Sequence, residues 1–379
     1  MPRIASVSVC SARVPLDRVA SFATRTVKVR DYCLVKVRST DGAEGIGYCY
    51  VGNTAGHIVR TAVQDLLAPM LIREESTRVE GLWEEMYREA LLHGRTGSVM
   101  RAISAIDIAL WDLNARAVEL PLYRYLGCWA TVTVPAYASG GYYLEGKTPE
   151  HLGEELASYV RQGFNAVKMK VGRLAPAEEE DRVRAARAAI GPSAHLMLDA
   201  NNAWSDLPTA LLYCKRFEKY DPYWIEEPFS PDDIENHAKL ASCTAIAVAT
   251  GEIEAGRWRF KEILDKRAAV ILQADAAVCG GISEWRRIAQ TAASYGVTMC
   301  PHWLHELHVH LVASVPNARY VEYFPDSKIL NFCRLLNRQL EAKDGHLPLP
   351  EAHGLGFEFD EKAVAKYALS AAQPWAVIQ

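Results

Sequence analysis

Three short apolar runs decide the fold of this chain: HLMLDAN (195–201), YWIEEP (223–228) and VATGE (248–252). Each run carries a carboxylate at or near its end, and Asp199, Glu226 and Glu252 follow one another at intervals of 27 and 26 residues. Helical stretches fill the intervals. This alternation of β-like runs and helical stretches is typical of repeated βα units in a parallel sheet.

The same rhythm continues on both sides of these runs. We predict eight strands, which end near Tyr137, Lys170, Asp199, Glu226, Glu252, Asp275, His302 and Glu322. Eight βα units are the number that closes a barrel. The sequence therefore predicts an α/β fold in which residues 131–330 form a (β/α)7–8 barrel of the TIM type.

Residues 1–130 follow a different pattern. Residues 4–14 and 31–38 alternate apolar with small or polar side chains, and Asp41-Gly42 predicts the turn of a hairpin. The run VMRAISAIDIALWDL (99–113) is apolar nearly all round, as in a buried helix. We predict an α+β capping domain here, and we expect residues 331–379, which contain no further βα unit, to return to it.

Composition excludes several classes of protein. With 50% hydrophobic and 23% charged residues, the 379-residue chain can bury a large core, and one large domain plus a smaller one is expected. The net charge of −4 and the absence of a dense Lys/Arg cluster argue against nucleic acid. No run is apolar enough for a signal peptide or a membrane span. Nine scattered cysteines without a C-x-x-C pair indicate reduced thiols, so we expect a cytoplasmic protein with a small-molecule ligand.

The three carboxylates predict a metal site. Strand ends of such a barrel face one cavity, where Asp199, Glu226 and Glu252 would repel one another unless a cation neutralised them. Mg²⁺ fits because it takes few carboxylates and keeps positions for water or substrate. Glu227 competes with Glu226, because strand alternation lets only one of them enter the cavity, and the sequence leaves this choice open. For each carboxylate alone, a solvated loop charge or a helix cap is the structural alternative.

Two lysines and a histidine supply candidate acid/base groups. Lys168 and Lys170 are one residue apart and project from one face of a strand, where a neighbouring metal would disfavour the ammonium form. Lysines on an exposed edge strand are the alternative reading. Asp275 and His302 end successive strands and predict a hydrogen-bonded pair. Three other histidines, in the segment HELHVHL, remain open as alternatives, as does a zinc site: His305, His308 and His310.

Taken together, these motifs resemble the enolase superfamily and, within it, the mandelate racemase subgroup. The resemblance covers nearly the whole chain, through AIDIALWDLNARAVELPLYRYLG, KMKVG, LDAN, IEEP, ATGE, QADAAVCGGIS, PHW and the closing glutamate. It implies one Mg²⁺ at Asp199, Glu226 and Glu252. It also implies the following roles: a base at Lys170, assistance at the substrate carboxylate by Lys168, a second acid/base at His302 paired with Asp275, and substrate contacts by Asn201 and Glu322, the last as a donor if it is protonated.

The resemblance also narrows the branch of the family. Lactonising and succinylbenzoate synthase types have a lysine where this chain has Asp275. The segments YASGGYY, PHWLHELHVHL and VEYF are more similar to sugar-acid dehydratases, especially those that act on galactarate and talarate. Departures from the family pattern are Cys128, where a second glycine often stands, and the tryptophan after His302.

The expected reaction is removal of the proton next to a carboxylate and loss of the 3-hydroxyl, which gives a 2-keto-3-deoxy acid. A racemase or epimerase, an aldonate dehydratase and a non-catalytic acid-binding protein are the alternatives. Specificity is expected in the cap, where a cation at the distal end of the substrate would favour aldarates; the candidates are Arg18, Arg25, Lys28 and Arg30. Arg25 and Tyr137 are taken as substrate contacts, and we expect a homo-oligomer.

Overall fold

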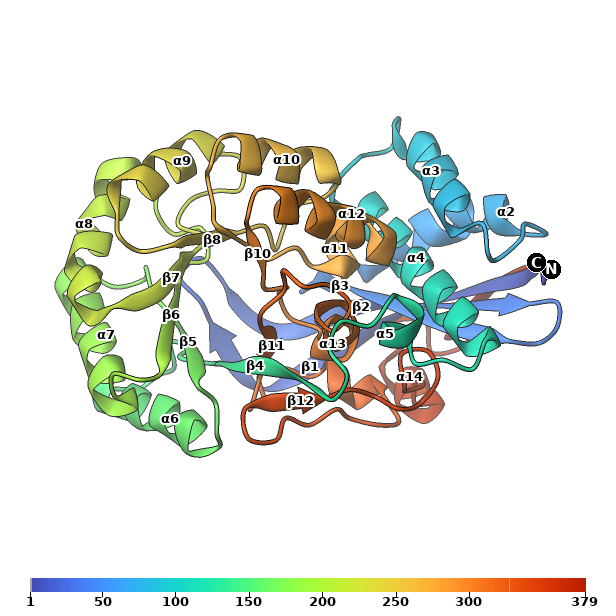
Figure 1. Cartoon of the computed structure of the whole chain (residues 1–379). Coiled ribbons are helices and arrows are strands. Elements are labelled where there is room, and N and C mark those ends of the chain that lie inside the picture. The colour runs from blue at the N-terminus through green and yellow to red at the C-terminus, as the bar shows by residue number, and fades with distance from the viewer. Residues whose placement is uncertain (1, 327) are drawn as a thin grey trace.

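The chain builds a capping sheet beside a barrel (Figure 1), and the computed structural model describes residues 2–326 and 328–379. The cap sheet is antiparallel, in the order β13-β1-β2-β3, with β1 at Ile4–Ser21, β2 at Thr26–Ser39, β3 at Glu44–Gly52 and β13 at Ala376–Ile378. The predicted hairpin at Asp41-Gly42 is confirmed, and Gly42 supplies the positive φ of 92° that this turn requires.

Helical segments that follow β3 contact the cap sheet: α1 (Gly56–Thr61), the π-helix η1 (Ala62–Leu67), α2 (Ala68–Leu71) and α4 (Gly97–Ala117). Two more pack on α4: α3 (Val79–Ala90) and α5 (Leu122–Tyr125). The predicted buried helix is α4, which packs on β2 and β3. Glycines make this contact possible, because a Cβ at Gly47 would lie 1.9 Å from the carbonyl oxygen of Ala105. On its barrel side, Asp107 of α4 accepts hydrogen bonds from the backbone N–H and the hydroxyl of Ser283.

Eight parallel strands form the barrel, in the order β10-β9-β8-β7-β6-β5-β4-β11. A parallel bridge between Met299 and Ala318 joins the two edges of this sheet. The predicted barrel is therefore confirmed. The strands are β4 (Thr133–Ser139), β5 (Ala166–Lys170), β6 (His195–Asp199), β7 (Pro222–Glu226), β8 (Val248–Thr250), β9 (Ile271–Leu272), β10 (Thr298–Met299) and β11 (Val321–Tyr323).

Helices lie outside the strands, and Figure 1 shows α6 to α10 as an arc around them. Their bounds are α6 (Pro149–Arg161), α7 (Pro176–Ile190), α8 (Leu207–Phe217), η2 (Glu218–Tyr220), α9 (Ile234–Cys243), α10 (Arg257–Asp265), α11 (Ala276–Cys279), α12 (Gly281–Ser294) and α13 (His305–Val312). Within the described residues, no helix is long and apolar enough to cross a membrane.

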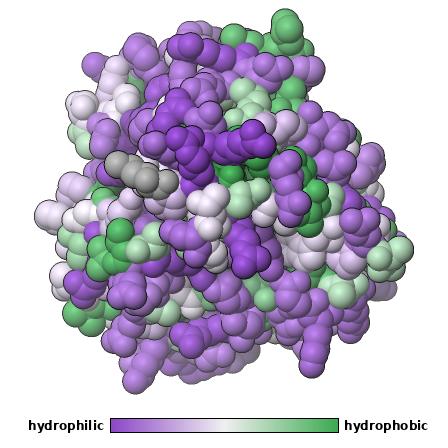
Figure 2. Space-filling model, turned by 90° about the vertical axis from the view of Figure 1, so that its right-hand side faces the viewer, coloured by the Kyte–Doolittle hydropathy of each residue, from purple (hydrophilic) through white to green (hydrophobic). Residues whose placement is uncertain are grey.

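The C-terminal tail connects both units. After η3 (Phe332–Leu335), β12 (His346–Pro348) pairs with barrel strand β4, whereas α14 (Glu361–Tyr367) and β13 contact β1 of the cap. The tail thus returns to the cap, as expected, and also extends the barrel sheet. The domain boundaries at residues 130 and 330 stay predictions. On the face shown in Figure 2, hydrophilic residues predominate and hydrophobic residues lie in small groups.

Candidate active site

Strand β5 places both lysines of the KMK motif on its inner side. Lys168 and Lys170 are buried, while Val167, Met169 and Val171 on the alternate face join the hydrophobic core. This alternation is the one that a strand imposes on successive side chains. The lysines are therefore not on a solvent-facing edge.

The three metal candidates converge at the ends of β6, β7 and β8. Carboxylate oxygens of Asp199, Glu226 and Glu252 lie within 4.8 Å of one another. Burial, and then the neighbouring charge of Asp199, raise the pKa of Glu226 to about 8. Oxygen ligands in this crowded, buried group fit a hard divalent cation such as Mg²⁺.

Glu227 also reaches the site, which corrects the expectation that only one glutamate of IEEP enters it. Strand β7 ends at Glu226, and Glu227 adopts a positive φ of 43°. The left-handed backbone breaks the alternation, so Glu226 joins the metal group while Glu227 lines the adjoining cavity. Burial, then the charge of Glu252, raises the pKa of Glu227 well above its usual range.

The lysines neutralise part of this negative charge. Lys168 Nζ lies 2.7 Å from Glu226 Oε1 and 2.8 Å from Glu322 Oε1, and Lys170 Nζ lies 2.5 Å from Asp199 Oδ2. Burial alone would lower the pKa of each lysine, but these carboxylates raise both above the ordinary value. The carboxylates gathered at this end of the barrel outnumber the two lysines: Asp199, Glu226, Glu227, Glu252 and Glu322. A divalent cation would offset that excess.

His302 completes the group of acid/base candidates. Its Nδ1 lies 3.2 Å from Asp275 Oδ2, and its Nε2 lies 3.7 Å from Glu252 Oε1. Burial alone would lower the pKa of His302, but Glu252 and Asp275 raise it to about 9. Asp275 also accepts a hydrogen bond from Ala277 N at the start of α11.

The other three histidines have structural partners instead. His308 accepts a hydrogen bond from Ala276 N, and its Nδ1 bonds to the carbonyl of Trp303. His310 accepts one from Tyr123 N, and His305 bonds to the carbonyl of Leu340. None of the three lines the catalytic cavity. The geometry therefore favours His302 among the histidines.

The cavity beside these groups has a volume of about 80 Å³. Among the residues expected to contact the substrate, Asn201, Glu322 and Arg25 line it. Asn201 Oδ1 is buried without a hydrogen-bond partner. Burial would raise the pKa of Glu322, but Lys168 and His302 lower it to about 2, which favours the carboxylate over the protonated donor that one of its expected roles requires.

Tyr137 lies deeper in the barrel than expected. It lies two residues before the end of β4 and belongs to a buried cluster inside the barrel with Trp224 and Tyr320. Lys168 Nζ lies 3.4 Å from its hydroxyl, and Tyr137 does not line the cavity. It contacts Lys168 inside the barrel, and its contact with the substrate stays a prediction.

Two of the residues that line the cavity, Tyr142 and Phe324, belong to the segments YASGGYY and VEYF, but neither was predicted as a site residue. No motif pointed to the other two, Phe22 and Leu330. Such side chains cannot be distinguished in a sequence from ordinary packing residues. Trp303, the last residue of the PHW motif, lines the cavity as well.

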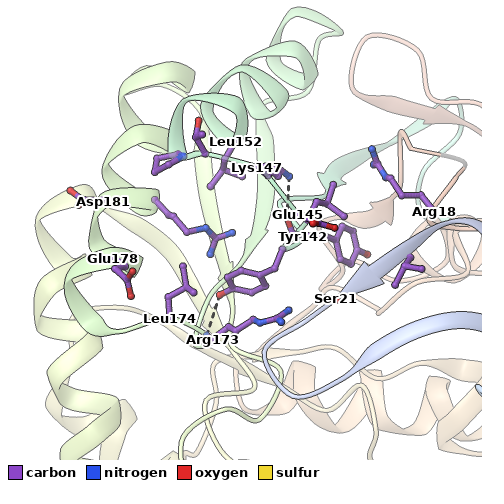
Figure 3. A pocket seen from close by; sticks show the side chains of 16 residues that line it. Arg18, Ser21, Tyr142, Glu145, Lys147, Leu152, Arg173, Leu174, Glu178 and Asp181 are labelled. Carbon is purple, nitrogen blue, oxygen red and sulfur yellow. Dashed lines mark hydrogen bonds between the residues drawn. The ribbon is translucent and has the colours of Figure 1, made fainter.

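A wider cleft of about 850 Å³ lies next to the catalytic cavity, and Tyr142 lines both. Figure 3 shows this cleft between Arg18 and Ser21 of β1 on one side and Leu152, Glu178 and Asp181 of the barrel helices on the other. The cleft runs along the junction of the cap and the barrel loops.

The fold and the site together define a class. Carboxylates, lysines and an Asp–His pair meet at the strand ends of a capped barrel, which is the arrangement of a metal-dependent acid/base enzyme. Residues 4–127 match the family model of the mandelate racemase / muconate lactonizing enzyme N-terminal domain, and residues 151–363 match the enolase C-terminal domain-like model. The chain belongs to the enolase superfamily, in its mandelate racemase and muconate lactonizing enzyme subgroup.

Three relatives refine this placement. The L-talarate/galactarate dehydratase of Salmonella typhimurium is 34% identical over 87% of this chain and 81% of its own length. The arabinonate dehydratase of Saccharolobus solfataricus is 32% identical over 88% and 89%. The 3,6-anhydro-alpha-L-galactonate cycloisomerase of Streptomyces coelicolor is 32% identical over 94% and 97%.

A solved structure of the Salmonella enzyme, liganded with Mg and L-lyxarohydroxamate, superimposes with a TM-score of 0.90. It is 30% identical in that alignment, which covers 100% of this chain and 94% of the other. Mg²⁺ is the cofactor, and the triad of Asp199, Glu226 and Glu252 is its site. By family and site, the chain is a Mg²⁺-dependent enzyme of the group that contains sugar-acid dehydratases and cycloisomerases.

Proposed function

We propose that the protein is a dehydratase of an aldarate such as galactarate or talarate. It would remove the proton at C2 and expel the 3-hydroxyl, giving a 2-keto-3-deoxy acid. One observation carries this proposal: two acid/base groups flank the metal triad. Lys170 Nζ lies 2.5 Å from Asp199 Oδ2, whereas His302 Nε2 lies 3.7 Å from Glu252 Oε1.

These two groups approach the site from different directions. Lys170 ends β5 and His302 follows β10, and four strands separate β5 from β10 in the sheet order. A bound acid between them presents one face to each. One group takes the C2 proton and the other protonates the departing hydroxyl, and the configuration at C2 decides which is the base.

The remaining residues hold the substrate and the acid/base pair. Bound Mg²⁺ would stabilise the negative charge that develops at the substrate carboxylate. The proton on the neighbouring carbon, C2, is otherwise only weakly acidic. Lys168 directs its ammonium toward the same end of the site. Asp275 orients His302 through Nδ1, so that Nε2 faces the cavity. Asn201 offers its unpartnered Oδ1 as an acceptor for a substrate hydroxyl.

A cycloisomerase is the second candidate, because the Streptomyces relative of that activity aligns over 94% of this chain. A cycloisomerase rearranges an anhydro acid or lactone without losing water. A racemase or epimerase of a 2-hydroxy acid would use the same two groups, but it returns the proton to C2 and expels nothing.

The test is a screen of the Mg²⁺-loaded protein against aldarates, aldonates and anhydro acids. A dehydratase produces a 2-keto acid with loss of one water, whereas a cycloisomerase gives an isomer of unchanged mass and a racemase exchanges the C2 proton for deuterium without a new carbonyl. Formation of 2-keto acid from no acid in the set would contradict the proposal. A cytoplasmic location and a homo-oligomeric state belong to the same proposal, and size measurement in solution tests the latter.

A further inference from the structure

Arg30 is a buried cation without a protein counter-charge. It lies on β2 opposite Val14 of β1, is 4% exposed and lines the catalytic cavity. Its Nε has no hydrogen-bond partner, and among the described residues no carboxylate forms an ion pair with it. Burial of an unpaired charge is costly, so a buried guanidinium is normally matched by an anion.

Aromatic rings compensate only part of this cost. The Cζ of Arg30 lies 4.4 Å from the ring centroid of Trp303 and 5.6 Å from that of Tyr50. The centroids of these two rings lie 4.5 Å apart, so the guanidinium lies against a pair of packed aromatic side chains. Cation–π contacts stabilise the charge but leave its N–H groups without acceptors.

Trp303 presents a second unpartnered donor at the same wall. Its Nε1 is buried without a partner, and the residue lines the cavity. Its backbone, at a positive φ of 56°, donates from N to Glu322 Oε2 at 2.8 Å and accepts from His308. These two bonds hold the backbone of Trp303 in place.

The other cap cations differ from Arg30 in their surroundings. Arg18 pairs with Asp326 and lines the outer cleft, and Lys28 is exposed. Arg25 lines the catalytic cavity as Arg30 does, but it is exposed to solvent. Arg30 alone of these four is buried at the catalytic cavity. A buried guanidinium without an acceptor from the protein needs a bound partner, whereas an exposed cation is solvated by water.

We infer that Arg30 and Trp303 form the distal subsite, which binds the second carboxylate of a dicarboxylic sugar acid. This inference rests on the proposed function and identifies the residues that set its substrate class. One end of the acid lies at the barrel groups, Lys168 and the metal triad, and the other reaches the cap strand that carries Arg30. A guanidinium binds a carboxylate through two parallel N–H bonds, which a terminal hydroxymethyl group cannot replace.

The experiment compares a hexarate with the hexonate of the same configuration, such as galactarate and galactonate, by kcat/KM of the Mg²⁺-loaded enzyme. Arg30→Met should reduce the hexarate-to-hexonate ratio about ten- to hundredfold, the usual effect of a charge-assisted hydrogen bond. Trp303→Phe keeps the ring and removes the donor, and should reduce the ratio about two- to tenfold. Arg30→Lys keeps the charge and should retain part of the ratio.

Lys28→Met is the matched control, since it removes an exposed cation from the same strand and should leave the ratio unchanged. An unchanged ratio in folded Arg30→Met overturns the inference, as does a wild-type preference for the hexonate. If Arg30→Met does not fold, the other two variants decide: an unchanged hexarate-to-hexonate ratio in both Arg30→Lys and Trp303→Phe overturns the inference.

Binding separates this inference from the proposed function. The rise in Tm that each acid produces with Mg²⁺ reports binding even when no product forms. A hexarate that stabilises the wild type more than the hexonate does, and loses this advantage in Arg30→Met, supports the distal subsite whatever the reaction. If neither acid yields 2-keto acid while that difference persists, the dehydratase proposal fails and the subsite stands.

Discussion

Replacement of Asp275 by asparagine tests how the site orients its histidine. In the wild type, Asp275 Oδ2 lies 3.2 Å from His302 Nδ1, and Oδ1 accepts from Ala277 N. Asparagine keeps one oxygen for Ala277 but presents an NH₂ group to His302. A donor at Nδ1 forces the imidazole proton onto Nε2, the nitrogen nearer Glu252, so His302 can no longer accept a proton there.

The size of the effect follows from the geometry. An imidazolium and a carboxylate 3.2 Å apart interact by about 5 kcal/mol at an effective dielectric constant of 20. Loss of this stabilisation, together with the wrong tautomer, should lower kcat by about 10²- to 10⁴-fold, or about 3 to 5 kcal/mol of barrier. Mg²⁺ affinity and Tm should change little, because asparagine is of equal size and keeps the bond to Ala277.

The assay is 2-keto acid formation by Asp275→Asn, by His302→Asn and by the double variant. Since Asp275 acts through His302, adding Asp275→Asn to His302→Asn should lower kcat by no more than about a further twofold. Full activity of Asp275→Asn, or a full additional loss in the double variant, would refute the assignment of Asp275 as the residue that positions His302.

Three further predictions concern the metal, the base and the cap. Asp199→Asn and Glu252→Gln should each weaken Mg²⁺ binding measured by titration calorimetry while the circular dichroism spectrum is kept, and EDTA should abolish turnover; activity that survives chelation would remove the metal from the mechanism. Lys170→Ala and His302→Asn should each lose at least about 10²-fold in turnover, but only the variant that keeps its base should still exchange the C2 proton in D₂O, and equal exchange in both would contradict two separate roles. Gly47→Ala should destabilise the cap by about 1 to 3 kcal/mol, because its Cβ would lie 1.9 Å from a backbone oxygen of α4; a Tm equal to that of the wild type would show that the helix moves away freely.

Strand periodicity was the informative signal in the sequence. Spacing predicted that Asp199, Glu226 and Glu252 meet, and alternation predicted the shared face of Lys168 and Lys170, because both depend on local backbone geometry. The alternation rule failed at Glu227, where strand β7 has ended and the backbone is left-handed, so that both glutamates of IEEP reach the site.

Two other misses have different causes. Strand β4 runs on to Ser139, which leaves Tyr137 inside the barrel, and strand ends are the least certain feature of a sequence pattern. Arg18 and Arg30 look alike in the sequence because burial and pairing are set by distant residues: Asp326 pairs with Arg18, and Trp303 stacks on Arg30. Long-range partners of this kind follow only from the folded chain.

The pairing of β13 with β1 separates the order of synthesis from the order of assembly. Val7 to Val9 leave the ribosome before any barrel strand, yet their partners Ala376 to Ile378 are made after all eight. Until then, one edge of β1 has unpaired N–H and C=O groups, the kind of edge that recruits other strands. A nascent chain with a complete barrel thus still exposes the unpaired edge of β1. Aggregation during expression should therefore depend on how quickly residues 376–378 are synthesised and pair with that edge.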